Sequence, residues 1–311
     1  RVQHRTPTTW GTLTAPAQAR PHPSKKPILK TQTICICISN GTTYVSPIAI
    51  SATTALRAKA LLAGHAPTET ATQTYIFPSE VVSQTRPASY PTSWGTQPNA
   101  DYSVDTGISQ SGVYSTRFLQ GLEELPTLSV VSDVDLLFGP SGIYSNTLDH
   151  NLEVAASAEY FQPQVGGSDG SIDGKDFQID CGARIQGGAS RSAGIRKHSM
   201  SLRFRSSYGD DKLDYNLFGS GVREFNGIHL RAMYNNSWVH GTSGQRTRAT
   251  MIRDQWVRDS MIAMGNADGG RGHFVHVYLN GLYWGVYNLQ ERIDDHHFSA
   301  YQGPSADTVD S

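Results

Sequence analysis

The chain has 311 residues, a formal net charge of -1 and 38% hydrophobic residues, which is typical of a globular protein of one or two domains. Its positive charge is scattered along the sequence, which excludes the electrostatic signature of a nucleic-acid-binding protein. No run of about 18 apolar residues occurs, so the sequence predicts no transmembrane helix. The three cysteines, Cys35, Cys37 and Cys181, show no spacing typical of a zinc site or a disulfide framework.

Residues 1–31 are rich in Pro, Thr, Ala and Lys and show no hydrophobic period. This composition predicts a linker or a disordered segment, and a sequence read out of frame would look the same. The first residue is Arg and no signal peptide is visible. We therefore expect the sequence to be a fragment of a longer gene product.

Short runs of β-prone residues occupy residues 32–78. Leu56, Ala58 and Ala60 alternate with Arg57 and Lys59, the pattern of a half-buried strand. Several such strands predict a small β-sandwich-like module. The stretch "SPIAISATTALRAKALLAGHAPTETATQTYIF" resembles the second half of the chitobiase/β-hexosaminidase C-terminal module, an immunoglobulin-like accessory domain of secreted bacterial proteins. The resemblance implies a partial module of this kind and an extracytoplasmic or cell-surface location.

Residues 79–120 are poor in aliphatic residues and rich in turn formers, which predicts a long linker. From residue 121 to residue 311 the pattern becomes that of a mixed domain, and the fold class of the whole chain is predicted as α+β. Asp133 and Asp135 follow the first strand of this domain. Two such carboxylates could bind a metal, but more often they cap a short helix, and we favour the cap.

A glycine-rich loop, residues 186–196, lies between strands predicted at 177–185 and 197–204. Gly187 and Gly188 would let backbone N–H groups approach an anion, and Arg191 would add positive charge. Lys197 begins the second strand, where its amine could reach a phosphate held under the loop. The loop contains neither a Walker sequence nor a nucleophile elbow, and a flexible hairpin loop would have the same composition.

Residues 245–264 have the composition and apolar spacing of one helix. Arg253 and Asp254 lie on it. Most charges on such a helix are solvated, but one of its carboxylates could instead orient Lys197. His273 and His276 are predicted on a strand with opposite orientations, so the sequence predicts no metal site between them.

The run "VYLNGLYWGVYNLQERID" at residues 277–294 predicts a β-hairpin, because its Asn-Gly pair tolerates positive φ at both central turn positions. Alternation along the second strand predicts that Trp284 and Tyr287 point to opposite faces of the sheet. Glu291 lies in the charged segment where this strand ends, at a place where side chains could meet a ligand.

Several stretches together resemble the CotH spore-coat kinase family. They are "LPTLSVVSDVDLLFGPSGIYSN", "GARIQGGASR", "RKHSMSLRFRSSYGDDKLDYNLFG", "HLRAMYNNSWVHGTSGQRTRATMIRDQWVRDSMIAMG" and "FVHVYLNGLYWGVYNLQERID". They run from about residue 125 to residue 303 and occur in the order of the family's motifs. The resemblance implies that residues 121–311 are the N-terminal part of a domain similar to the small lobe of protein kinases. It also implies transfer of phosphate from ATP, with magnesium, to Ser/Thr hydroxyls of a protein.

The resemblance also implies roles for particular residues. Lys197 matches a basic residue of the family and would contact the nucleotide phosphates together with Arg191, Gly187 and Gly188. Glu291 would lie at the hinge, beside the adenine base, and Asp254 and Arg253 would support the site. The carboxylates that position the acceptor and hold magnesium in this family are expected beyond Ser311, so no catalytic residue and no metal ligand is assigned within the sequence. The chain alone is therefore predicted to be inactive.

Two other functions compete with the kinase. The same fold could serve a non-catalytic surface or matrix protein. A glycoside hydrolase would need two carboxyl groups about 5 to 9.5 Å apart in a cleft, for example Glu123 or Glu159 with Asp133. The expected partner is a protein substrate. No nucleic-acid partner and no transmembrane segment are expected, and the oligomeric state is left open.

Overall fold

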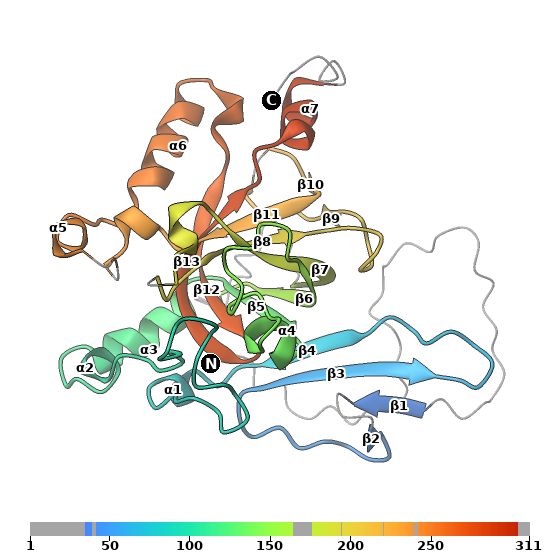
Figure 1. Cartoon of the computed structure of the whole chain (residues 1–311). Coiled ribbons are helices and arrows are strands. Elements are labelled where there is room, and N and C mark those ends of the chain that lie inside the picture. Colours follow the sequence, from blue (N-terminus) through green and yellow to red (C-terminus); the bar gives the residue numbers. More distant parts are fainter. Residues whose placement is uncertain are drawn as a thin grey trace.

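The computed structural model describes most of the chain (Figure 1). The described residues are 35–38, 42–163, 176–193, 195–219, 221–238, 240 and 242–303. The predicted linker at residues 1–31 lies outside them. No helix in these ranges is long and apolar enough to cross a membrane.

Seven strands form a closed barrel in the order β11-β13-β12-β5-β6-β7-β8. Neighbours are antiparallel except β5 and β12, which are parallel. The strands are β5 (Thr127–Ser132), β6 (Val154–Phe161), β7 (Phe177–Gln186), β8 (Ser199–Arg203), β11 (Gly227–Arg231), β12 (Gly272–Leu279) and β13 (Leu282–Glu291). The α+β prediction is confirmed. The closure of the sheet was not predicted, and the likeness to a kinase small lobe stays a prediction.

The barrel interior holds the main hydrophobic core, because every other residue of each strand points inward. In β7 the inward set is Ile179, Cys181, Ala183 and Ile185, all buried. The outward positions of the same strand include Asp180 and Arg184. This alternation places polar and charged side chains on the outer face of the barrel.

The predicted hairpin at residues 277–294 is confirmed, but the predicted faces of its second strand are wrong. Asn280 and Gly281 have φ values of 50° and 81°, as a tight hairpin turn requires. The register shifts next to Val277, and Gly285 has a φ of 113°. This bulge changes the alternation, so that Trp284 and Tyr287 both pack against the main core.

Helices surround the barrel. They differ from the prediction in two regions, residues 245–264 and residues 79–120. The α-helices are α1 (Pro78–Val81), α2 (Thr106–Ser109), α3 (Ser115–Glu124), α4 (Val134–Phe138), α5 (Ser243–Arg246), α6 (Arg253–Ala263) and α7 (Asp295–Gln302). The single helix predicted at 245–264 is interrupted at Met251, whose φ of 63° is incompatible with a right-handed helix. The predicted linker, residues 79–120, contains most of α1, all of α2 and much of α3, and two of its aromatic residues, Trp94 and Tyr102, are buried in the main core.

The remaining elements are short. They are the 3-10 helices η1 (Ala189–Arg191), η2 (Tyr234–Asn236) and η3 (Ala267–Gly269), and the paired strands β9 (Leu213–Asp214) and β10 (Glu224–Phe225). Asp133 stands at the N-cap position of α4, as predicted, but its side chain forms no capping hydrogen bond.

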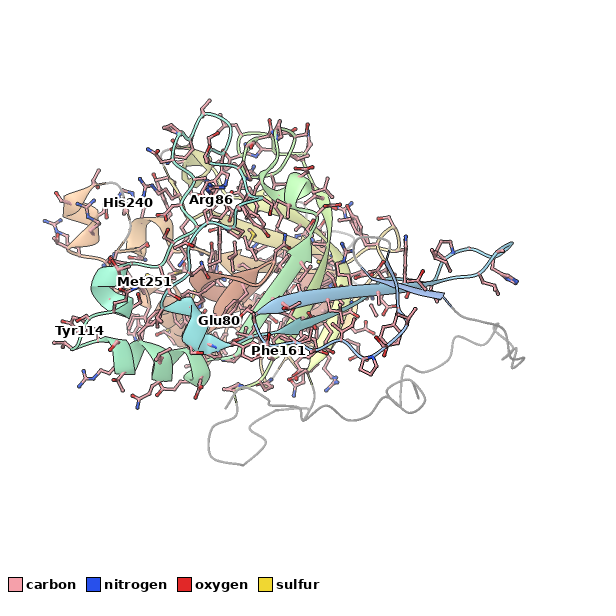
Figure 2. All side chains as sticks on the ribbon, turned by 90° about the horizontal axis from the view of Figure 1, so that it is seen from below. Glu80, Arg86, Tyr114, Phe161, His240 and Met251 are labelled. Carbon is pink, nitrogen blue, oxygen red and sulfur yellow. The ribbon has the colours of Figure 1, made fainter. Side chains whose placement is uncertain are left out.

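A separate sheet of order β2-β1-β3-β4 precedes the barrel, and its β3–β4 hairpin projects from the body of the molecule in both views (Figures 1 and 2). Its strands are β1 (Cys35–Ile38), β2 (Thr42–Thr43), β3 (Thr54–Leu61) and β4 (Ala71–Tyr75). Glu80 of α1, labelled in Figure 2, accepts a hydrogen bond of 2.7 Å from the Thr53 backbone N–H at the base of β3. That the sheet belongs to a chitobiase-like module stays a prediction.

The contact between β4 and the outer face of the barrel is polar. Glu159 of β6, only 2% exposed, accepts hydrogen bonds from the Thr74 backbone N–H at 3.1 Å and from Thr74 Oγ1 at 2.5 Å. Thr74 Oγ1 also lies 2.9 Å from Ser129 Oγ. Burial raises the pKa of Glu159 to about 7, even though the Thr74 hydrogen bonds act in the opposite direction. A carboxyl group covered by β4 in this way is not in an open cleft, so the hydrolase pair suggested for Glu159 is wrong.

Candidate functional site

Lys197 lies beside the bulge of β13. Its Nζ donates a hydrogen bond of 2.7 Å to the Val286 carbonyl and lies 4.5 Å from the centre of the Tyr287 ring. A Cβ added at Gly285 would come within 2.8 Å of the same nitrogen, so the glycine makes room for the amine. Burial lowers the pKa of Lys197 to about 8. The amine is therefore bound to the backbone of β13, and no contact joins it to Glu291 or to Asp254.

The glycine-rich loop is closed by Arg191, which is 2% exposed. Its Nε donates to the Gly187 carbonyl at 2.7 Å, and its Nη1 donates to the Thr147 carbonyl at 2.7 Å and the Asp149 carbonyl at 3.2 Å. Its Nη2 donates to the Ile185 carbonyl. The guanidinium N–H groups of Arg191 donate to these carbonyls, so they do not face a phosphate as predicted. Gly194 of the loop lies outside the described residues.

Gly187 and Gly188 lie where β7 leaves the barrel. Gly187 has a φ of 124°, and a Cβ there would meet Ser190 Oγ at 2.2 Å. Gly188 is exposed, and a Cβ there would meet nothing within 4 Å. The local structure thus requires a glycine only at position 187, and the reason is the backbone conformation of the turn. Binding of an anion by these two glycines stays a prediction.

Glu291 is the centre of a buried polar cluster at the end of β13. Its Oε2 accepts a hydrogen bond of 2.6 Å from the Arg271 backbone N–H, and its Oε1 accepts one of 2.7 Å from the Tyr301 hydroxyl. His297 Nδ1 lies 3.9 Å from Oε2. At 2% exposure, Glu291 connects α7 to the barrel, and its predicted place beside an adenine base remains untested.

Asp254 joins α6 to the outer face of the barrel, although not through Lys197 as predicted. Its Oδ2 accepts hydrogen bonds from Arg231 of β11 at 2.8 Å, from Gln290 of β13 at 2.8 Å and from Arg258 at 3.1 Å. The Gln290 hydrogen bond and the two guanidinium groups outweigh partial burial and lower the pKa of Asp254. Arg253, by contrast, is exposed and donates to the Arg248 carbonyl.

Four half-buried arginines gather on the outer face of β7, β8, β11 and the end of β13, strands that lie side by side in Figure 1. We call this surface the arginine face, and its members are Arg184, Arg203, Arg231 and Arg292. A Cβ added at Gly227 would lie 3.2 Å from Arg203 Cδ and 3.5 Å from Arg292 Cδ, so this glycine lets the two side chains cross the sheet closely. Arg231 pairs with Asp254, and Arg292 pairs with Asp294.

The other two arginines of the face have no counter-ion in direct contact. Arg184 and Arg203 form no ion pair within the described ranges, and the Nε atom of each is buried without a hydrogen-bond partner. Burial and the nearby charges of Arg292 and Arg184 lower the pKa of Arg203 to about 10, although the Glu153 carboxylate acts in the opposite direction. Guanidinium groups without a direct carboxylate partner at a half-buried surface attract anions, and their planar geometry suits phosphate.

His229 lies among these arginines. In the strand register it is opposite Ser201 on one side and Gln290 on the other, and Ser201 is opposite Arg184. His229 Nε2 and Ser201 Oγ are both buried without a hydrogen-bond partner. The arginine face thus combines positive charge with unused hydrogen-bonding atoms, which is the chemistry of an anion site.

The sequence analysis missed the arginine face, because its members lie on strands far apart in the sequence. Each arginine is unremarkable alone, and only the pairing of β8 with β11 and of β11 with β13 brings them together. One signal was present in the sequence. Arg184, Arg203 and Arg231 each occupy a position that alternates with buried aliphatic residues, which marks them as outward-facing.

Comparison with known proteins finds a family match that covers this surface. Residues 183–309 match the family of the CotH kinase protein. The matched segment runs from β7 to α7 and contains all four members of the arginine face. No curated protein matches the chain. The match supports the predicted CotH resemblance over these residues and does not extend to residues 32–78.

Proposed function

We propose that the chain is part of an ATP-dependent phosphotransferase of the CotH type and that its arginine face binds the phosphate groups of the nucleotide. The observation that carries this proposal is that Arg184 and Arg203, which lie inside the segment that matches the CotH kinase protein, form no ion pair within the described ranges and each have a buried Nε without a hydrogen-bond partner. Phosphoryl transfer depends mainly on positioning and on neutralising phosphate charge, and guanidinium groups supply both. Protein Ser/Thr hydroxyls are the proposed acceptors, on the basis of the resemblance.

The ion pair between Arg231 and Asp254 has a positioning role in this proposal. It connects a barrel strand to α6, so movement of the helix would move the guanidinium at the edge of the arginine face. The described residues contain no group of three or more His, Cys, Asp or Glu side chains that could hold a metal ion. Magnesium therefore belongs to the proposal through the resemblance alone, and no step is assigned to it.

We expect Arg203→Gln and Arg184→Gln each to weaken binding of ATP by about tenfold or more, because each removes a charge-assisted hydrogen bond worth about 1.5 to 3 kcal/mol. Isothermal titration calorimetry with ATP measures the effect. Arg223→Gln is the matched control, since Arg223 is a surface arginine paired with Asp214 on the β9–β10 hairpin. Its affinity should equal that of the wild-type chain.

Lys197→Met distinguishes the arginine face from the site under the glycine-rich loop. Our proposal predicts unchanged ATP affinity for this variant, because the Lys197 amine is bound to the Val286 carbonyl. If ATP affinity falls in Lys197→Met and is unchanged in Arg184→Gln and Arg203→Gln, the phosphate lies under the loop and the proposal is wrong. Tripolyphosphate should compete with ATP, which tests whether the phosphates are the part recognised.

A further inference from the structure

His229 is a half-buried histidine whose side chain forms no hydrogen bond with the described residues, and its Nε2 is buried. A buried polar nitrogen without a partner is destabilising, so its place in the middle of a cation cluster calls for a physical explanation. Its neighbours across the sheet, Ser201 and Gln290, are polar as well. Ser201 Oγ also has no partner, while Gln290 is engaged by Asp254.

The charged groups around His229 come from every element that packs beside it. Arg203 extends from β8, Arg231 from β11, and Arg292 and Asp294 from the segment after β13. Burial and the three arginine charges lower the pKa of His229 to about 4, and Asp294 opposes them only in part. In the absence of an anion the imidazole is therefore neutral at physiological pH, and protonation would add a further positive charge to the cluster.

Resting on the function proposed above, we propose that His229 is an anion-binding residue that takes up a proton when a phosphate group enters the arginine face. Burial and the charges of Arg203, Arg292 and Arg231 keep the imidazole neutral, and a phosphate group bound at Arg203 brings negative charge that offsets them. A proton from water then adds to the free ring nitrogen, so that both ring nitrogens carry hydrogen. The positive ring then attracts the phosphate oxygens, and the ligand itself is not altered.

This coupling makes the affinity for oxyanions dependent on pH in a defined direction. An anion within about 4 to 6 Å raises the pKa of a histidine by about 1 to 3 units. At a pH between the pKa of His229 in the free protein and its pKa in the complex, the complex holds one more proton than the separate partners. Affinity should therefore rise as the pH falls, by up to about tenfold per pH unit near pH 5.5.

The test is isothermal titration calorimetry with sulfate, which does not itself titrate in this pH range. Titrations near pH 5.5 in two buffers with different ionisation enthalpies give the number of protons taken up. We expect uptake of about 0.2 to 0.9 of a proton for the wild-type chain, as a rise of the His229 pKa by about 1 to 3 units implies, and none for His229→Asn and His229→Gln, which keep polar groups but do not titrate. The affinity of both variants should change little with pH.

His150→Asn is the matched control, because His150 is exposed in a loop and should leave the proton uptake unchanged. Circular dichroism checks that each variant is folded. If sulfate binds without proton uptake, or if uptake persists in both His229 variants, the role of His229 is wrong while the arginine face stands. If neither sulfate nor ATP binds to the wild-type chain, the proposed function fails, and the role of His229 fails with it.

Discussion

Replacing Arg191 by Met is expected to destabilise the protein by about 3 kcal/mol or more. The substitution keeps an unbranched chain of similar length but removes the guanidinium donors from the carbonyls of Gly187, Thr147, Asp149 and Ile185. A buried acceptor left without a partner costs about 1 to 3 kcal/mol. Urea unfolding followed by circular dichroism measures the loss.

Arg196→Met is the control for this substitution. Arg196 lies five positions further along the same loop, its side chain is 58% exposed, and it pairs with Asp101 at 3.2 Å. Exposed ion pairs contribute about 0 to 1 kcal/mol, so this variant should unfold close to the wild-type midpoint. Arg191→Lys should be intermediate, because one ammonium cannot reach all four carbonyls. Equal stability of Arg191→Met and wild type would contradict the role described for Arg191.

The stability of the protein is expected to fall by about 2 to 3 kcal/mol as the pH rises from 4.5 to 7, through Glu159. Its pKa is raised in the folded state, so between these pH values the folded chain holds a proton that the unfolded chain has lost. Below pH 4.5 the Glu159 carboxyl group is protonated in both the folded and the unfolded chain, and its full contribution to stability is present. Above pH 7 both are ionised, and burial of the charge then opposes folding.

Glu159→Gln should remove this pH dependence, because glutamine resembles the protonated carboxyl group and can still accept from the Thr74 N–H. We therefore expect the variant to be more stable than the wild-type chain at pH 8 and similar to it at pH 4.5. Urea unfolding at both pH values decides the matter. Glu124→Gln, a change in an exposed residue of α3, should leave the pH profile unchanged. An identical profile for Glu159→Gln and wild type would contradict the raised pKa.

Local patterns in the sequence predicted local structure well. The Asn-Gly pair identified the β12–β13 turn, and alternation identified β7 almost to the residue. The bulge at Gly285 was missed because alternation assumes a regular strand. The single helix predicted at 245–264 was wrong because nothing in the composition signals the left-handed backbone at Met251.

The candidate site was harder to predict, because the same type of side chain can bind either a ligand or another part of the protein. An arginine in a glycine-rich loop can bind a phosphate or the carbonyls of its own loop, and for Arg191 only the folded position of Thr147 decides between them. A carboxylate of this helix was expected to orient Lys197, but Asp254 is hydrogen-bonded to Arg231, Gln290 and Arg258 instead. Pairings between distant strands determine such contacts, and one sequence without homologues does not reveal them.

The parallel pairing of β5 with β12 has a consequence for how the chain reaches its native state. β12 and β13 complete the barrel by joining β5 to β11, so until the ribosome has released residues 272–291 both of those strands remain open edges. Contacts of such long sequence separation slow folding, and exposed edges favour aggregation in the meantime. The nascent barrel therefore depends on its last hairpin, β12 and β13, to cover both open edges.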